Sequence, residues 1–281
     1  MFMILNNKYK CLLLLLYLFF TSCGGNENQI QTPEKVPPLN ILYKDAFMNY
    51  EKGEWRKAIR LFQKVETRYS FSEWSPRATL MIMYIYYEVG ERIKTLEYAK
   101  KFKNLYLKNK NLDYVEFIIG LTFYEEINVI SRDQTNSEAA LDQFKKIINL
   151  YPTSIYAEEA KLKIDLINEQ LAGNHMYIAR YYMKKSKWIA AIKRLEITIN
   201  DYQTTIYVKE ALHRLVEIYY RLGNIKESKK YAALLGYNFN DSDWYKKSYK
   251  IIADKDYIIK KEEKQKRKLR DRVKKLFQFS K

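Results

Sequence analysis

The stretch Gly53-Glu54-Trp55-Arg56-Lys57-Ala58-Ile59 decides the fold, because related stretches occur four more times along the chain. Every copy has a small residue at the position of Ala58, and most copies continue with larger apolar residues four and seven places later. These positions share one helix face, where a small side chain permits close approach to a neighbouring helix. The pattern predicts the second helix of a repeated helix-turn-helix unit. The other small residues are Thr95, Ala140, Ala191 and Ser228.

The spacing of these units indicates the kind of repeat. The small residues of the first two units, and again of the last two, are 37 residues apart, close to the period of about 34 of the tetratricopeptide repeat. Longer intervals around Ala140 and Ala191 predict lengthened helices or an inserted loop. Residues 128–136 lose helical periodicity and are expected to form a loop between the two helices of the third unit.

We therefore predict an all-α fold, a right-handed superhelical solenoid of about five tetratricopeptide helix-turn-helix repeats, with a concave binding surface. A generic helical bundle is the alternative. Gly53, Gly90 and Gly223 are expected between the helices of their units in the left-handed conformation. The first helix of the fourth unit is expected to carry Tyr177 and Ala179, with Tyr182, on its packing face.

Composition supports a folded helical protein. Apolar residues make up 47% of the 281 residues and aromatic residues 15%, which excludes a disordered chain. Only eight Gly and five Pro are present, which is few for a turn-rich β-sandwich. The chain is long enough for one large domain or two smaller ones.

The first residues have the pattern of a lipoprotein signal. Lys8 and Lys10 precede the apolar run 11–20, and Ser22 stands directly before Cys23. We predict a signal peptide at 1–22, lipidation of Cys23 and a flexible linker at 23–38. An ordinary secretory signal and an uncleaved anchor are the alternatives. The predicted folded part then contains no cysteine and hence no disulfide.

Two further segments complete the predicted organisation: a repeat domain at 39–245 and a basic extension at 246–281. The extension holds fifteen basic and five acidic side chains, whereas the whole chain has a net charge of +17. Its Leu269, Val273 and Phe277 repeat at helical spacing, which suits an anionic membrane surface or an acidic partner. A solvated lysine-rich extension is the alternative, and secretion disfavours nucleic acid.

No pattern in the chain predicts catalysis. Its two histidines, His175 and His213, stand in separate predicted helices without a metal-ligand spacing, and no known nucleophile or phosphate-loop motif is present. We predict no enzymatic activity, no metal site and no cofactor.

Several stretches of the repeats resemble one protein family in their order and spacing. They include Arg68-Tyr69-Ser70-Phe71, Tyr151-Pro152-Thr153-Ser154-Ile155-Tyr156-Ala157, Ala179-Arg180-Tyr181-Tyr182 and Ala190-Ala191-Ile192-Lys193-Arg194. Together with the lipoprotein signal they are similar to the BamD family, which takes part in assembling outer-membrane β-barrel proteins. The resemblance covers about residues 39–249, together with the region of Cys23.

The resemblance implies a lipid-anchored scaffold on the periplasmic side of the outer membrane, within the BAM complex. Its implied partners are the periplasmic domains of a BamA-type insertase, unfolded β-barrel proteins and other BAM lipoproteins. Arg194, with Lys193 beside it, matches the family's contact to the insertase, since a guanidinium can bind a carboxylate through two bonds. Tyr69, Phe71 and Trp74 match an aromatic turn at the substrate groove.

A second function remains open at this point. A repeat lipoprotein that organises cell-wall synthesis or pilus secretin assembly would have the same repeats and the same lipid anchor. Only assembly of β-barrel proteins assigns specific partners to Arg194 and to the turn at Tyr69.

Overall fold

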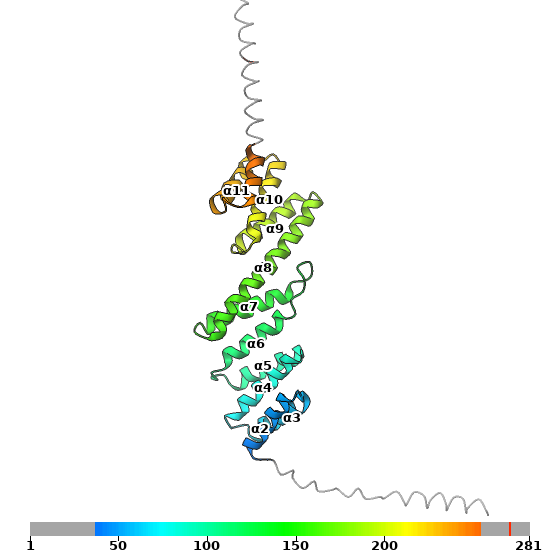
Figure 1. The fold of residues 1–281 in the computed structure, drawn as a ribbon, viewed down its shortest axis with the longest axis vertical. Coiled ribbons are helices and arrows are strands. Elements are labelled where there is room, and N and C mark those ends of the chain that lie inside the picture. Colours follow the sequence, from blue (N-terminus) through cyan, green and yellow to red (C-terminus); the bar gives the residue numbers. More distant parts are fainter. Residues whose placement is uncertain (1–36, 254–269, 271–281) are drawn as a thin grey trace, which may run out of the picture. The chain divides into compact units, whose positions relative to one another are not determined.

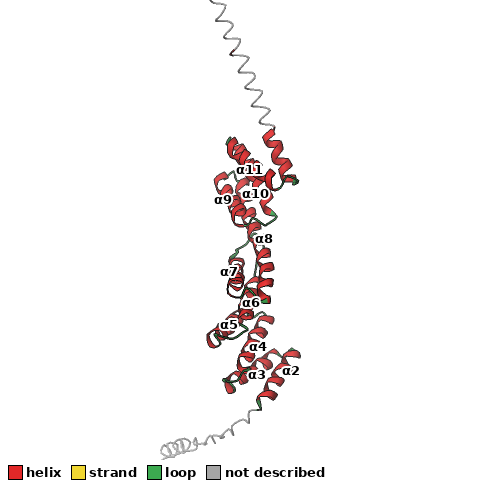
Figure 2. Cartoon of the chain, turned by 90° about the vertical axis from the view of Figure 1, so that its left-hand side faces the viewer, coloured by secondary structure: helices red, strands yellow, loops and turns green. Residues whose placement is uncertain are grey.

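The fold was determined from a computed structural model that describes residues 37–253 and residue 270. The chain divides into a unit of residues 1–41 and a unit of residues 42–281. Helices fill most of the described residues, which contain no strand (Figure 2). Cys23, the signal peptide and most of the basic extension lie outside the described residues. The helices are α2 (Leu39–Glu51), α3 (Trp55–Arg68), α4 (Trp74–Glu88), α5 (Arg92–Leu105), α6 (Leu112–Tyr124), α7 (Thr135–Leu150), α8 (Ile155–Lys184), α9 (Trp188–Asp201), α10 (Tyr207–Arg221) and α11 (Ile225–Asn238).

The helices form five consecutive pairs, α2/α3 to α10/α11, and from α3 onward each helix packs on the next in the chain (Figure 1). The first helices of neighbouring pairs also touch, α4 on α6, α6 on α8 and α8 on α10. This double pattern of contacts, within a pair and between first helices, is that of a tetratricopeptide-repeat solenoid. The predicted all-α repeat fold is confirmed.

A buried layer runs through the second helices of the repeats. All five small residues of the repeated pattern have no exposed surface, and neither do the residues seven places after them. Four places after the small residue, three repeats have a large residue, Phe62, Phe144 or Leu195, which is also fully buried. The small residues thus let neighbouring helices approach, as the pattern predicted. The residues seven places on are Val65, Phe102, Ile147, Thr198 and Leu235.

The turn between the two helices has one geometry in four of the five repeats. Gly53, Gly90 and Gly223 have φ of 73°, 74° and 78°, as predicted. In each case the glycine N–H bonds to the carbonyl three residues back and the next N–H to the carbonyl five residues before it, closing the helix end. Ser186 takes the same place in the fourth repeat with φ 53°, which the sequence did not indicate.

The third and fourth repeats carry the two changes that the longer intervals predicted, an inserted loop and a lengthened helix. Helix α8 has 30 residues, and residues 125–134 form a loop between α6 and α7. The loop is fastened to α8, because Gln170 Nε2 donates to Asn128 O at 2.7 Å and Asn174 Nδ2 donates to Ile130 O at 2.6 Å. A loop is therefore confirmed at the predicted place, although residues 135 and 136 of the predicted range 128–136 belong to α7, and the loop packs against a neighbouring helix.

After α11, residues 243–253 are again helical. Trp244 and Tyr245 pack on a small core of Val208, Leu212 and Leu235. Ser248 has no exposed surface. The boundary predicted at 245/246 falls within this helical segment, whose first residues belong to the packed core.

Candidate binding surfaces

The turn that follows α3 presents an aromatic side chain to solvent. Tyr69 directly follows α3, and its carbonyl accepts hydrogen bonds from both the backbone N–H and the hydroxyl of Ser72, at 3.0 and 2.6 Å. The two bonds fix the turn that contains Phe71. The Phe71 side chain is fully exposed, at 105% of its reference area. A rigid turn therefore holds an apolar ring in water.

Trp74, the third predicted residue of this turn, has a different environment. It is half-buried as the first residue of α4, with its ring 4.6 Å from that of Tyr43 and the Arg77 guanidinium 4.8 Å from the ring centroid. Burial raises the pKa of Tyr43, and the charge of Arg77 lowers it in part. Trp74 thus joins α2 to α4, and Phe71 is the most exposed of the three predicted residues.

Arg194 lies half-buried on α9 and contacts α8. Its Nη1 is 3.2 Å from Nδ1 of His175. Burial lowers the pKa of His175, and the positive charge of Arg194 lowers it further, so a neutral imidazole can accept the bond. Arg194 has no carboxylate partner within residues 37–253, and Lys193 beside it is exposed. The guanidinium is oriented by one bond and keeps further donors.

A groove that the sequence did not indicate lies on the first helices of the last two repeats. Its volume is about 560 Å³ and its lining comes from α8 and α10. A smaller hollow of about 210 Å³ adjoins it and shares Met183 and Arg214. We call the two together the cationic groove. Its main lining residues are Tyr177, Arg180, Tyr181, Met183, Lys184, Trp188, Arg214, Glu217 and Arg221.

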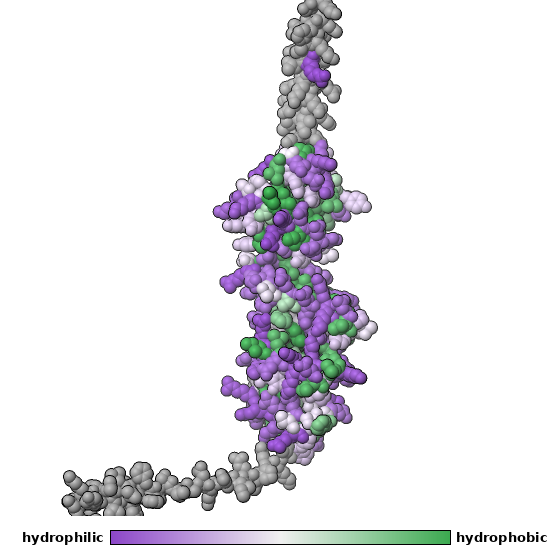
Figure 3. Space-filling model, turned by 180° about the vertical axis from the view of Figure 1, so that it is seen from behind, coloured by the Kyte–Doolittle hydropathy of each residue, from purple (hydrophilic) through white to green (hydrophobic). Residues whose placement is uncertain are grey.

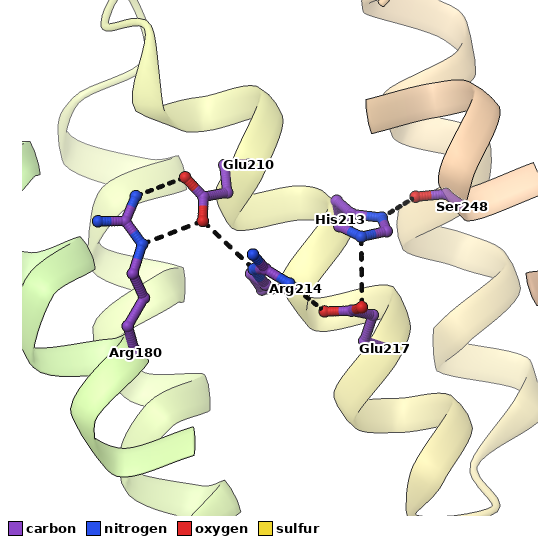
Figure 4. A network of polar contacts seen from close by, with 6 residues as sticks. All are labelled: Arg180, Glu210, His213, Arg214, Glu217 and Ser248. Carbon is purple, nitrogen blue, oxygen red and sulfur yellow. Dashed lines mark hydrogen bonds and ion pairs between the residues drawn. The ribbon is translucent and has the colours of Figure 1, made fainter. Parts of the chain in front are cut away.

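A chain of charged side chains runs from α8 to α10 and includes Arg180, Arg214 and Glu217 of the cationic groove (Figure 4). Arg180 binds Glu210 through two bonds, at 3.0 and 2.5 Å. Arg214 then binds Glu210 at 3.2 Å and Glu217 at 2.8 Å. Burial raises the pKa of Glu217, but hydrogen bonds from His213 and Arg214 outweigh it and lower the pKa to about 2. Both carboxylates are therefore matched by arginines.

His213 continues this network into the segment 243–253. Its Nε2 lies 3.4 Å from Glu217, and its Nδ1 lies 2.8 Å from the hydroxyl of Ser248. His213 and His175 are thus in separate helices, as predicted, and each has a structural partner. Among the described residues, no group of three His, Cys, Asp or Glu is placed to hold a metal ion.

Sequence reasoning missed the groove for an identifiable reason. Tyr177 was expected on the packing face of α8 with Ala179 and Tyr182, and that is wrong for Tyr177, which is 51% exposed, whereas Ala179 is fully buried. The spacing of residues 177, 180, 181 and 184 places them on one helix face. The prediction grouped Tyr177 with Ala179 and Tyr182, whereas its position next to the charged residues at 180 and 184 argues for solvent.

The surface contains apolar residues as separate patches in a mostly polar surround (Figure 3). Exposed large apolar side chains include Phe71, Ile93, Ile189 and Tyr237. Single exposed apolar side chains are common at protein surfaces. In the described part of the chain, no helix combines the length and apolar character needed to span a bilayer.

Comparisons with known proteins agree with the sequence resemblance. Residues 37–235 match the family model YfiO, described as an outer membrane lipoprotein. The outer membrane protein assembly factor BamD of Caulobacter vibrioides is 35% identical over 83% of this chain and 76% of that protein. BamD of Rickettsia prowazekii is 35% identical over 82% of this chain and 92% of that protein.

The solved structures that the chain matches share little sequence with it. PilW, a type IV pilus biogenesis factor, has a TM-score of 0.36 and 14% identity, covering 74% of this chain and 96% of its own. A tetratricopeptide-repeat protein of Thermus thermophilus has a TM-score of 0.35 and 14% identity, covering 77% of this chain and 100% of its own.

The buried layer, the repeated turns and the rows of first helices define a tetratricopeptide-repeat scaffold. The family model and the curated relatives each match most of it. The chain belongs to the BamD family of outer membrane protein assembly factors.

Proposed function

We propose that this chain is a non-enzymatic scaffold of the BAM complex, anchored at the outer membrane by lipid on Cys23 and facing the periplasm. In this proposal its C-terminal repeats bind the periplasmic domains of a BamA-type insertase, and its N-terminal repeats receive unfolded β-barrel proteins. Family membership supports the general role. The observation that carries the residue-level proposal is the oriented, carboxylate-free guanidinium of Arg194.

The geometry at Arg194 suits recognition of a carboxylate on the insertase. His175 holds the guanidinium from one side through a single bond. Arginine has five N–H donors, so two can still bind both oxygens of one carboxylate. Because the side chain is already oriented, less rotamer freedom is lost when the partner binds. Lys193 adds a second positive charge that attracts an acidic surface.

The test is co-purification of outer-membrane proteins with this chain from detergent extracts. We expect an insertase-type barrel protein with the wild type and its loss with Arg194→Glu. Arg194→Lys keeps the charge without the planar fork and should retain only part of the partner. Lys185→Glu, an equal charge reversal at an exposed position before α9, is the matched control and should retain it. Recovery of a cell-wall synthase or a secretin instead of an insertase would favour the alternative function.

The turn at Phe71 is proposed to receive substrate. A barrel strand carries apolar and aromatic side chains at alternate positions, and an exposed ring on a fixed turn can contact them at little cost in ordering. A further row of rings is available on the same repeats: Phe47 lies 5.7 Å from Tyr50, and Tyr50 lies 6.3 Å from Tyr84. Phe47 is itself partly exposed.

A labelled peptide with the sequence of the last strand of an outer-membrane barrel tests this role by fluorescence anisotropy. Phe71→Ser should weaken binding by about tenfold, equivalent to about 1.4 kcal/mol. Ile189→Ser is the control, since it also removes an exposed apolar side chain but lies on α9. Equal affinities of wild type and Phe71→Ser would remove Phe71 from the substrate site.

The lipid anchor is tested separately with radiolabelled palmitate. The wild type should incorporate label and fractionate with the outer membrane, whereas Cys23→Ser should incorporate none. Label in the serine variant would exclude Cys23 as the modified residue.

A further inference from the structure

The cationic groove has an excess of positive charge that the chain itself does not balance. Its lining includes four cationic side chains, those of Arg180, Lys184, Arg214 and Arg221. Two of them, Arg180 and Arg214, are matched by Glu210 and Glu217. Within residues 37–253, Lys184 and Arg221 have no carboxylate partner. Two positive charges are therefore free to meet anionic groups of a ligand.

The groove also offers aromatic and apolar area next to these charges. Tyr177 and Tyr181 stand on α8 at 51% and 55% exposure, and Met183 links the larger and the smaller hollow. The Arg221 guanidinium lies 5.2 Å from the centroid of the Trp188 ring, so its position is fixed by a cation–π contact. A volume of about 560 Å³ is within the range of pockets that bind small ligands.

The walls are held rigidly, which favours binding over collapse of the groove. The Arg180–Glu210–Arg214–Glu217 chain joins α8 to α10, and His213 and Ser248 tie α10 to the segment 243–253 (Figure 4). A ligand would therefore find the lining already arranged, and it would lose less free energy to ordering the protein.

We propose that the cationic groove binds an acidic peptide segment of a partner protein. Carboxylates of the segment meet Lys184 and Arg221, and an apolar or aromatic side chain between them lies against Tyr177 and Tyr181. This site is on the first helices of the last two repeats, whereas Arg194 lies on the second helix α9, so the inference does not depend on the proposed insertase contact.

Charge identifies the occupant. The chain's own residues 254–281 contain twelve basic and five acidic side chains, so this segment would be repelled by the groove. A second copy of a chain with a net charge of +17 is disfavoured for the same reason. An acidic segment is attracted, and carboxylates form the strongest hydrogen bonds with guanidinium and ammonium groups.

The test uses the full chain in mild detergent and a short, end-blocked, fluorescein-labelled peptide in which Glu alternates with Leu and Trp. The control peptide has Gln in place of every Glu. Lys184→Gln with Arg221→Gln removes the two free charges at exposed positions and should leave the helical circular dichroism unchanged. The matched control protein is Lys185→Gln, in which the neutralised side chain lies next to Lys184 in sequence but does not line the groove.

We expect the Glu peptide to bind the wild type and the double variant to bind it about tenfold more weakly. Lys185→Gln should stay within about twofold of the wild type, the Gln peptide should not bind, and added salt should weaken binding. Arg194→Glu should bind the Glu peptide as the wild type does, which separates this site from the insertase contact.

Three outcomes would overturn the proposal. The first is equal binding of the Glu and Gln peptides. The second is equal affinity of the double variant and the wild type. The third is stronger competition by another polyanion. In that case a single-stranded oligonucleotide, or phosphatidylglycerol vesicles, would displace the labelled peptide at a lower concentration of negative charges than the unlabelled peptide does. That result would make the groove a general anionic surface.

Discussion

The first two and the last two repeats differ most at one position of their first helices. Seven residues before the small residue of each repeat stand Glu51 and Glu88 in the first two, but Lys184 and Arg221 in the last two. Four residues further back, the first two repeats have Phe47 and Tyr84, whereas the fourth has Arg180 and the fifth has Glu217, which binds Arg214. The same helix face is aromatic and acidic near one end of the array and cationic near the other.

The buried side of the same repeats does not change in this way. The small residue and the residue seven places after it have no exposed surface in any repeat. Packing therefore fixes the second-helix pattern, because a larger side chain there would separate the helices. No such constraint acts on the outward face of the first helices. The contrast teaches that one scaffold can present two surfaces of opposite chemistry, one at each end.

The largest expected effect tests whether the buried layer is common to both ends. Phe62→Ala and Leu195→Ala remove fully buried side chains at the same repeat position. We expect Phe62→Ala to lower the free energy of unfolding by about 3–5 kcal/mol and Leu195→Ala by about 2–5 kcal/mol. Urea denaturation followed by circular dichroism measures both. If either substitution lowered the free energy of unfolding by less than about 1 kcal/mol, the buried layer would not stabilise both ends of the array.

The turns give a second comparison, with effects of opposite sign. Gly223→Ala places a Cβ at φ 78°, which we expect to destabilise the protein by about 1 kcal/mol. No atom lies within 4 Å of the added Cβ, so the effect comes from the backbone alone. Ser186→Gly relieves the same conformation at φ 53° and should stabilise by up to about 1 kcal/mol. The shift of the urea midpoint measures both effects, and a destabilising Ser186→Gly would contradict backbone strain at Ser186.

Acid should lower the free energy of unfolding through Glu217, which lies on α10 in the last repeat. Burial raises the pKa of this carboxyl, but His213 and Arg214 lower it to about 2. A lowered pKa in the folded state stabilises the fold above the unfolded value of about 4.3, and this contribution is lost as pH falls toward about 2. Because the group is partly exposed, we expect a loss of only a few tenths to about 1 kcal/mol.

Urea denaturation at a series of pH values measures this contribution. Glu217→Gln should have a shallower decline of stability over that pH range than the wild type. An equal decline in the two proteins would assign the acid sensitivity to other groups.

The smallest expected effect concerns Tyr84 in the second repeat, on the aromatic and acidic face of the first two repeats. Burial, followed by the neighbouring carboxylate of Glu88, raises the pKa of Tyr84 to about 12. Glu88→Gln should lower that pKa but leave it above the ordinary value of about 10, because burial remains. Carbon-13 resonances of labelled tyrosine, with Tyr84→Phe for assignment, measure the change. An unchanged pKa in the Gln variant would assign the whole shift to burial.

The sequence was informative where one residue type has one physical reason to be present. Ala58 and its four counterparts must be small for close helix packing, and glycine at 53, 90 and 223 tolerates a left-handed backbone. Both signals predicted the observed structure. The loop in the third repeat followed from lost periodicity, which is likewise a local property.

The rest of the structure depends on contacts between segments far apart in the sequence. Ser186 gives no local signal for its positive φ, because the surrounding repeat imposes it. The bonds of Glu210 to Arg180, and of His213 to Ser248, join residues 30 and 35 positions apart. Such pairs arise only when the helices are placed. Tyrosine is ambiguous as well, since its ring suits a core and its hydroxyl suits solvent, which explains the error at Tyr177.

Helix α8 has a consequence for cooperativity. It packs on α6 and α7 as well as on α9 and α10. A single helix of about 45 Å therefore contacts both the middle of the array and its C-terminal part. Repeat arrays with weak neighbour coupling can unravel from their ends. Here the first helix of the fourth repeat also covers both helices of the third, so unfolding of the fourth repeat would expose the third. Repeats three to five should therefore lose hydrogen-exchange protection as one block, while the first two can open separately.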